Sequence, residues 1–347
     1  MKEISMADIE LLHDVLTKSS RTAIVTHMKP DGDAIGSSTA MYHFMKAYSE
    51  ADIKIVLNDR FQHVLGFLTE GDISDDIRIF SEDSNAATKA IADADTIICL
   101  DFNAFHRTDN LSSLLEASNA VKILIDHHLN PDSKSFGIIF SEIEVSSASE
   151  LLYKILMKMP EISDDASRLP AASATALMTG MTTDTNNFSN SVYPSTLAMA
   201  SSLLAAGVDR DHILDRLFNQ HSESRLRLMG HMMKDLLTIT EDGAAYMILD
   251  MKTQREYGIR EGDTEGFVNM PLSISQVRLS LLVKEDTDRI RVSIRSKKGT
   301  SANRCAREFF NGGGHENAAG GRLDIPIHEV EEYLKKHIHI YLTDYEA

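Results

Sequence analysis

Short apolar runs rich in β-branched residues recur along the first half of the chain. They are apolar at almost every position, which is typical of strands covered on both faces, and we predict strands at residues 22–26, 53–57, 96–100 and 121–125. Segments with helical spacing lie between them, for example at 36–48 and 85–92. The alternation predicts a doubly wound α/β fold with a parallel sheet.

Helical spacing continues beyond the last of these strands, and the second half of the chain then changes character. We predict helices at residues 149–158, 170–182 and 195–206, and a connector helix whose apolar stripe is Leu226, Met229, Met233 and Leu236. Runs at 245–249, 277–283 and 290–294 and a helix at 329–337 indicate a second, smaller mixed α/β domain. We therefore divide the chain into 1–220, a connector at 221–237, and 238–347.

Acidic and imidazole side chains follow three of the predicted strands. Open α/β sheets bind their ligands at the carboxyl ends of the strands, so we expect these side chains to converge on one rim. Asp184, at the end of the helix predicted from residue 170, adds a further carboxylate. The groups at the strand ends are His27, Asp31 and Asp33, then Asp101, and then Asp126, His127 and His128.

Pro30 and Gly32 interrupt the helical pattern after the first strand, so we place Asp31 and Asp33 on a turn. Two carboxylates this close repel one another unless a cation or a shared proton lies between them. An isolated Asp-x-Asp is more often a capped loop with solvated carboxylates, but the groups at the other strand ends favour a metal site. Nitrogen and oxygen donors suit Mn²⁺ or Mg²⁺ better than a thiolate-binding metal, and six of them are enough for two ions.

A glycine-rich segment, residues 312–321, is the conspicuous feature of the second domain. Unhindered backbone N–H groups in such a run can form a nest for phosphate oxygens, although a glycine-rich loop is more often simply a turn. Arg295 follows the strand predicted at 290–294. Its guanidinium could bind a phosphate with two hydrogen bonds, and a solvated surface arginine is the equal alternative.

These motifs together resemble the DHH family of phosphoesterases, whose name matches the triplet Asp126-His127-His128. The Gly-Gly-Gly-His run, followed by two alanines and a glycine, resembles the DHH-associated C-terminal domain of that family. The resemblance covers nearly the whole chain. It implies an active site in the cleft between a catalytic domain and a substrate-binding domain.

The resemblance also implies roles for individual residues. Asp33 or Asp101 would bridge two metals, Asp126 would orient a neighbouring imidazole, and His128 would contact the substrate phosphate. Substrate would be bound by Arg295, Gly313, Gly314 and His315. Two Mn²⁺ ions, or Mg²⁺ in their place, would be held by His27, Asp31, Asp33, Asp101, His127 and Asp184.

Within the family, the chain is similar to the branch of nano-RNases and pAp phosphatases, the bifunctional oligoribonucleases. That branch implies hydrolysis of short oligonucleotides to mononucleotides and of 3′-phosphoadenosine 5′-phosphate (pAp) to AMP. A pyrophosphatase or exopolyphosphatase is the first alternative, although family II pyrophosphatases carry a different second domain. Cyclic-dinucleotide phosphodiesterases share both domains but often add membrane and sensor segments. A catalytically silent nucleotide-binding protein is a remote alternative, since every expected ligand position is filled.

Charge and cysteine content narrow the choice of partners and compartment. The 35 basic and 52 acidic side chains give a net charge of -17, which argues against long duplex nucleic acid as a partner. Short oligonucleotides or phosphorylated nucleotides remain, because bound metal ions invert the potential inside one site. Two cysteines without paired spacing and no run of roughly 20 apolar residues predict a cytoplasmic protein with no membrane insertion. The oligomeric state stays open, with a homodimer favoured by general frequency.

Overall fold

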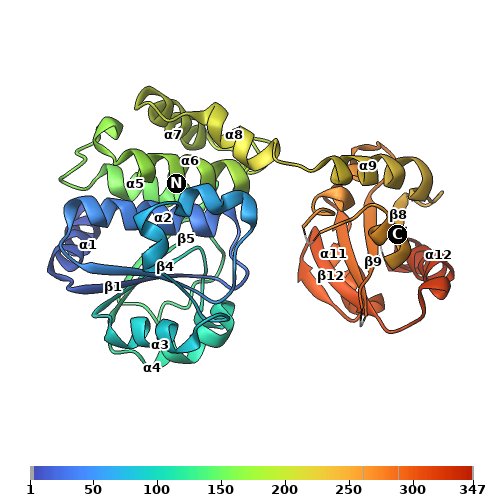
Figure 1. Ribbon diagram of the computed structural model, residues 1–347, viewed down its shortest axis with the longest axis horizontal. Helices are drawn as coiled ribbons and strands as arrows, with labels where there is room; N and C mark the ends of the chain where they lie inside the picture. Colours follow the sequence, from blue (N-terminus) through green and yellow to red (C-terminus); the bar gives the residue numbers. More distant parts are fainter. Residues whose placement is uncertain (1–3, 261, 288, 346–347) are drawn as a thin grey trace. The chain divides into compact units, whose positions relative to one another are not determined.

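The computed structural model describes residues 4–260, 262–287 and 289–345. The chain forms two compact units, Met1–Gln220 and His221–Ala347 (Figure 1). Each unit has its own six-stranded sheet and its own apolar cores. Of the helices in the described ranges, none combines the length and the apolar character that crossing a bilayer requires.

The sheet of the first unit is entirely parallel, with strand order β3-β2-β1-β4-β5-β6. This order reverses direction between β1 and β4, which is where doubly wound folds bind ligands. The predicted parallel sheet is confirmed, and the structure adds two edge strands, β3 and β6. The strands are β1 (Arg21–Thr26), β2 (Asp52–Leu57), β3 (Ile77–Ile79), β4 (Thr96–Leu100), β5 (Val121–Asp126) and β6 (Ile138–Ser141).

Helices cover both faces of this sheet (Figure 1). On one face lie α1 (Met6–Lys18), α2 (Gly32–Tyr48), α5 (Ala148–Met157) and α6 (Ala171–Asp184), which form the larger core. On the other face lie α3 (Ser84–Asp93) and α4 (Ser112–Ala117). Two more helices, α7 (Pro194–Ala205) and α8 (Arg210–Phe218), form an outer layer beside α6. Short 3-10 helices lie at His63–Thr69, Asp72–Asp76, Phe105–Leu111 and Ala166–Arg168.

The second unit is built on a mixed sheet with the order β11-β12-β10-β9-β8-β7. Among the strand pairs of the described residues, only β8–β9 is parallel, so the sheet is mixed and the predicted second mixed α/β domain is confirmed. The strands are β7 (Thr238–Ile239), β8 (Ala244–Leu249), β9 (Leu279–Glu285), β10 (Ile290–Ser296), β11 (Gly313–His315) and β12 (Ala318–Leu323). The helices are α9 (Glu223–His231), α10 (Met251–Glu256), α11 (Ala302–Phe309) and α12 (Val330–Ile340), with 3-10 helices at Phe267–Ser273 and Ile327–Glu329.

The segment predicted as a connector packs on the second unit. It consists of α9 followed by a π-helical stretch, Met232–Leu236. A second π-helical stretch follows α12 at Tyr341–Tyr345. Leu228 and Met232 are fully buried in a core with Met247 and Phe267. Of the predicted apolar stripe, Met229, Met233 and Leu236 are partly buried against this core. The prediction is wrong for Leu226, which is 51% exposed.

A carboxylate fastens α2 to the edge of the parallel sheet. Asp76 accepts hydrogen bonds of 2.6 Å from the hydroxyl of Tyr42 and from Lys54 Nζ, and Lys46 Nζ lies 3.1 Å away. Burial raises the pKa of Asp76, but these three partners lower it to about 2. Because this is below the value of about 3.9 in an unfolded chain, Asp76 contributes stability that is present above that value and is lost as the pH falls through about 2.

We expect Asp76→Asn to lower the melting temperature at neutral pH, because an amide cannot replace the charged acceptor. The difference from the wild type should shrink as the pH falls from about 4 towards 2, where the native carboxylate takes up its proton. Thermal unfolding across this pH range measures the effect, with the exposed neighbour exchanged in Asp75→Asn as control. A difference that stays constant with pH would contradict the assignment.

Candidate metal centre

The predicted site residues gather at the carboxyl ends of β1, β4 and β5. Thr26 pairs with Leu100, and Leu100 pairs with Ile125, so these three strands end at the same level. His27, Asp101 and His127 therefore emerge side by side, at the reversal of strand order. The backbone of Asp101 has a φ of 63°, a left-handed conformation that aspartate tolerates better than most residues.

The loop after β1 ends sooner than the sequence suggested. Asp31 is the N-cap of α2, and its side chain accepts from the backbone N–H groups of Asp33 and Ala34, both at 3.1 Å. Asp33 lies in the first helical turn, so its predicted place on a turn is wrong. Pro30 does not prevent this, because it precedes the cap and lies outside the helix.

Asp33 is buried and bound by the N-terminus of another helix. Its side chain is 1% exposed, and it accepts from the backbone N–H of Ala148 at 2.6 Å and of Ser149 at 2.9 Å. These amides open α5, where N–H groups have no partner inside the helix and the helix dipole favours negative charge. Each oxygen of Asp33 keeps a further lone pair for a cation.

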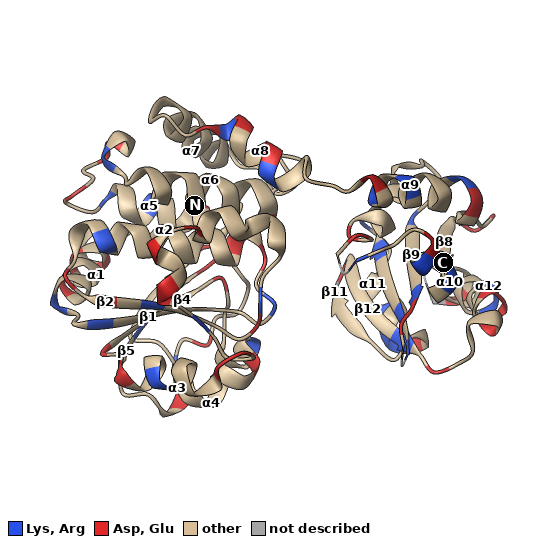
Figure 2. Ribbon diagram, viewed as in Figure 1, with Lys and Arg blue, Asp and Glu red and all other residues tan. Residues whose placement is uncertain are grey.

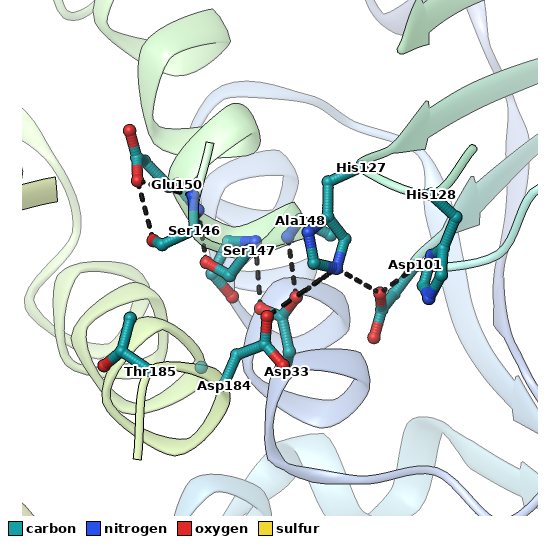
Figure 3. A network of polar contacts seen from close by, with 12 residues as sticks. Asp33, Asp101, His127, His128, Ser146, Ser147, Ala148, Glu150, Asp184 and Thr185 are labelled. Atoms are coloured by element: carbon teal, nitrogen blue, oxygen red, sulfur yellow. Dashed lines mark hydrogen bonds and ion pairs between the residues drawn. The ribbon is translucent and has the colours of Figure 1, made fainter. Parts of the chain in front are cut away.

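Seven side chains form three overlapping groups in which potential ligand atoms lie within 4.8 Å of one another. Asp101 belongs to two groups, and His127 also belongs to two. Figure 3 shows His127 between Asp101 on one side and Asp33 and Asp184 on the other. The groups are Asp101, His127 and His128; His27, Asp31 and Asp101; and Asp33, His127 and Asp184.

Within these groups, the imidazole nitrogens and carboxylate oxygens that face one another are farther apart than in a close hydrogen bond. His127 Nε2 lies 3.4 Å from Asp101 Oδ1, 3.7 Å from Asp184 Oδ2 and 4.0 Å from Asp33 Oδ2. On the other side, His27 Nε2 lies 3.5 Å from Asp101 Oδ2 and 3.8 Å from Asp31 Oδ1. All six predicted metal ligands thus lie in one connected cluster.

The electrostatics of the cluster are dominated by crowded carboxylates. Burial, together with Asp101 and Asp184, raises the pKa of Asp33 well above its ordinary value. Burial also raises the pKa of Asp184, and although His127 opposes this, Asp101 and Asp31 bring it to about 6. A divalent cation in the cluster would oppose both shifts, because positive charge favours the ionised carboxylates.

The pKa values of His27 and His127 are raised as well, because carboxylates surround both rings. Burial lowers the pKa of His27, but Asp101 and Asp31 raise it to about 10. Burial lowers the pKa of His127 as well, and Asp101, Asp33 and Asp184 likewise raise it to about 10. Burial raises the pKa of Asp101, but these two imidazoles take it below its ordinary value. The imidazolium protons stand in for positive charge that a metal would supply.

Hydrogen bonds fix the orientation of two imidazoles. Nδ1 of His27 lies 2.8 Å from the carbonyl oxygen of Met28, to which it donates in the tautomer that leaves Nε2 for a metal. The fully buried Asp126 accepts from the backbone N–H of His128 at 3.1 Å and lies 2.7 Å from its ring Nδ1. The imidazole that Asp126 orients is therefore that of His128.

The donor set fits a hard divalent cation. Asp101 Oδ1 is buried and has no hydrogen-bond partner among the described residues, an arrangement that is costly unless a cation meets it. Imidazole nitrogens and carboxylate oxygens suit Mn²⁺ or Mg²⁺. Cys99 lies on β4 but packs into the core of the opposite sheet face, so no thiolate joins the set.

The second unit holds the other predicted site residues. Arg295 lies within β10, opposite Ser280 on β9 and Ala318 on β12. Its Nη1 donates to the carbonyl oxygen of Ile294 at 2.9 Å. Burial lowers the pKa of this guanidinium, and Glu265 opposes the shift.

The glycine run forms a strand pair. Gly313 pairs with Gly320 on β12, and a methyl group at Gly314 would lie 2.6 Å from the carbonyl oxygen of Ala318. The N–H of Gly314 donates to Asn303 Oδ1 at 3.0 Å, so the predicted row of free amides is interrupted there. The side chain of His315 lies outside the described part of the structure.

Sequence reasoning missed the support around Asp33. Ser147 caps α5 by accepting from the N–H of Glu150, at the spacing of a capping box, Ser-x-x-Glu. That spacing stands in the sequence at 147–150 and could have placed the helix start one residue earlier. The hydrogen bonds from Ala148 and Ser149 to Asp33 span more than 100 residues, and no local pattern predicts them.

Comparison with known proteins identifies the family. Residues 21–181 match the DHH family, N-terminal domain, and residues 242–340 match the DHHA1 domain. The solved structure of an exopolyphosphatase-related protein from Bacteroides fragilis is 37% identical, has a TM-score of 0.90, and covers 99% of this chain and 98% of its own. This chain belongs to the DHH family.

Two further similarities concern the family at greater distance. The bifunctional oligoribonuclease and PAP phosphatase NrnA of Bacillus subtilis is 25% identical over 97% of this chain and 98% of its own length. A crystal structure of exonuclease RecJ bound to manganese has a TM-score of 0.58 at 15% identity and covers 98% of this chain and 94% of its own. The likeness to RecJ shows the fold alone.

Two glycines allow the helices that carry the carboxylates to touch. A methyl group at Gly36 on α2 would lie 2.7 Å from the carbonyl oxygen of Ala176 and 2.8 Å from Cα of Gly180, both on α6. A methyl group at Gly180 would lie 2.9 Å from Asp33 Oδ1. The close crossing of α2 and α6 thereby sets the distance between Asp33 and Asp184.

We expect Gly36→Ala to destabilise the protein by about 1–3 kcal/mol, because the new methyl group meets backbone that cannot yield. Gly230→Ala is the matched control: this glycine is also helical, on α9, but nothing lies within 4 Å of an added methyl group. There the better helix former should add about 0.5–1 kcal/mol. Urea unfolding of the two variants compares them, and equal effects would refute the packing argument.

Proposed function

We propose that this chain is a two-metal phosphoesterase that hydrolyses short oligonucleotides to mononucleotides and pAp to AMP. The observation that carries the proposal is the cluster around Asp101, whose buried Oδ1 has no hydrogen-bond partner within the described structure, although two imidazoles lie within 4 Å of it. The name of the Bacillus subtilis relative, which aligns over nearly the full length of both chains, supports this pair of substrates.

The proposed metal ligands are the six residues of the connected cluster. Divalent cations held there would supply Lewis-acid stabilisation of the negative charge that develops on a phosphoryl group. Mn²⁺ is the proposed ion, since the RecJ structure of the same fold is bound to manganese. The ligands are His27, Asp31, Asp33, Asp101, His127 and Asp184.

His128 is proposed to contact the substrate, and Asp126 is proposed to orient the His128 ring. His128 is 28% exposed, and its Nδ1 is already held by the buried Asp126. In its protonated form the ring can donate Nε2–H to a phosphate oxygen, while Asp126 fixes its direction. The pair would orient the phosphoryl group and balance part of its charge.

The second unit is proposed to bind the rest of the substrate. Arg295 offers a forked donor for a second phosphate, and Gly313 and Gly314 present a strand without side chains to which His315 belongs. Basic and acidic residues are interspersed over both units (Figure 2). A net charge of -17 supports short substrates over long duplexes, which need an extended basic surface.

A second candidate is hydrolysis of pyrophosphate or polyphosphate. The Bacteroides fragilis structure, named as exopolyphosphatase-related, supports it through 37% identity over nearly the whole chain. The same metal cluster would serve either reaction, since both break a phosphoryl–oxygen bond. The two functions differ in whether a nucleoside must be bound.

A substrate panel tests the choice. The protein is loaded with Mn²⁺ or Mg²⁺ and given a 5′-phosphorylated dinucleotide, pAp, a cyclic dinucleotide and inorganic pyrophosphate, and the products are separated chromatographically. We expect mononucleotides and AMP, with pyrophosphate intact and Mn²⁺ the better ion. Asp101→Asn, which keeps the left-handed backbone, should lose nearly all turnover. If pyrophosphate were the only substrate hydrolysed, the second candidate function would replace the first.

Arg295→Ala should raise KM for the dinucleotide by roughly ten- to hundredfold while kcat changes less, because a charged hydrogen bond to phosphate is worth about 1.5–3 kcal/mol. Arg291→Ala is the control, since Arg291 lies on the same strand with its side chain 59% exposed. Steady-state kinetics of both variants separates the two parameters. An unchanged KM in Arg295→Ala would remove this residue from the substrate site.

A further inference from the structure

Two of the proposed metal ligands depend on the same corner of the first unit. Asp33 is held by the first amides of α5, Ala148 and Ser149. Asp184 is the last residue of α6, and the loop that follows it leads to α7 at Pro194. The start of α5 and the start of α7 must therefore be held in place for the group Asp33, His127 and Asp184 to keep its geometry.

The backbone of the loop between Asp184 and Pro194 adopts several left-handed conformations. Asn186, Asn187, Phe188 and Ser191 all have positive φ angles, between 45° and 64°. Such conformations are unfavourable for Phe188 and Ser191, although asparagine tolerates them better, and surrounding contacts help to impose them. A fixed anchor at the far end of the loop is one such constraint.

Glu150 holds both the start of α7, where this loop ends, and the segment just before α5. It is fully buried, and Oε2 accepts from the backbone N–H of Ser146 at 2.9 Å and from its hydroxyl at 2.6 Å. The same oxygen accepts from the hydroxyl of Thr196 at 2.6 Å, while Oε1 accepts from Ser195 at 2.6 Å. Ser195 and Thr196 belong to the first turn of α7, and Lys154 Nζ lies 2.9 Å from Oε1. Figure 3 shows Glu150 behind Ser146 and Ser147, on the far side of the loop from His127.

We infer that Glu150 is a positioning residue for one of the two metal ions, the ion held by Asp33, His127 and Asp184. It acts through the α5 amides that hold Asp33 and through the anchored end of the loop behind Asp184, and it reaches no ligand itself. The inference rests on the proposed function, because it presumes that this group binds a metal. The other ion, at His27, Asp31 and Asp101, is held by the strand ends and the α2 cap and does not depend on Glu150.

The selectivity of this effect distinguishes positioning from general support of the fold. Glu150→Gln keeps the size of the side chain, but its amide NH₂ replaces one acceptor oxygen and faces either hydroxyl donors or the Lys154 ammonium. Residues behind the ligands typically change metal affinity by roughly 10- to 100-fold. In Glu150→Gln, the affinity should therefore change for only one of the two proposed metal ions.

Calorimetric titration with Mn²⁺ alone, on the full chain, tests the inference. We expect two binding events in the wild type, and in Glu150→Gln one event weakened by roughly tenfold or more with the other unchanged. Turnover of Glu150→Gln should recover as the Mn²⁺ concentration is raised. The control is Asp76→Asn, which removes another hydrogen-bonded carboxylate of the same unit at a distance from the cluster. It should leave both events unchanged.

A second variant keeps the test decisive if Glu150→Gln does not fold. Thr196→Val removes the hydroxyl that donates to Glu150 and accepts from the backbone N–H of Tyr193, with little change in shape, and it should weaken the same event in the same direction. Both events unchanged in a folded Glu150 or Thr196 variant, or both weakened equally, would overturn the positioning role. Failure of the metal assignment itself has another signature: Asp33→Asn would then leave Mn²⁺ binding as it is in the wild type.

Discussion

Repulsion among buried carboxylates is the constraint on which the rest of the first unit depends. Asp33 and Asp101 are almost completely buried, and Asp184 lies on the far side of His127 from Asp101. Placing like charges this close in a medium of low permittivity is unfavourable by several kcal/mol unless positive charge compensates for it. The protein supplies two imidazoles and the N-terminus of α5, and the proposed cations would supply further compensation.

The surrounding architecture follows from holding these charges in place. Glycines at positions 36 and 180 let α2 and α6 approach until their backbones touch, and this contact sets how far Asp33 lies from Asp184. The N-terminus of α5 then meets Asp33 with two amides that any helix leaves unpaired. A fully buried Glu150 behind that N-terminus is costly in isolation, but four hydroxyl and amide donors and a lysine satisfy it.

The parallel sheet and the cluster at its edge were predictable because both follow from local pattern. Apolar runs identify buried strands, and polar residues directly after such runs meet at one edge. The start of α2 was misjudged because Pro30 was taken to exclude a helix that begins two residues later, at a capped position. Glu150 could not be assigned from sequence, since its partners Ser195 and Thr196 lie about 45 residues away and are polar residues of ordinary appearance. The glycine run was predicted as a phosphate nest, whereas its close strand pairing depends on Asn303 and β12.

The net charge of -17 and the proposed anionic substrates are compatible for a physical reason. Much of the acidity relevant to catalysis is concentrated in the cluster, where divalent ions would turn a negative centre into one that attracts phosphate. Elsewhere the acidic surface repels a long polyanion along its whole length, and a short substrate that fits within the site escapes most of that repulsion, since exposed charges are screened beyond about 8 Å at physiological salt. The acidic surface outside the site thus disfavours long nucleic acids. Inside the site, the positive charge that bound metal ions would supply favours phosphate. A preference for very short oligonucleotides then requires no dedicated steric barrier.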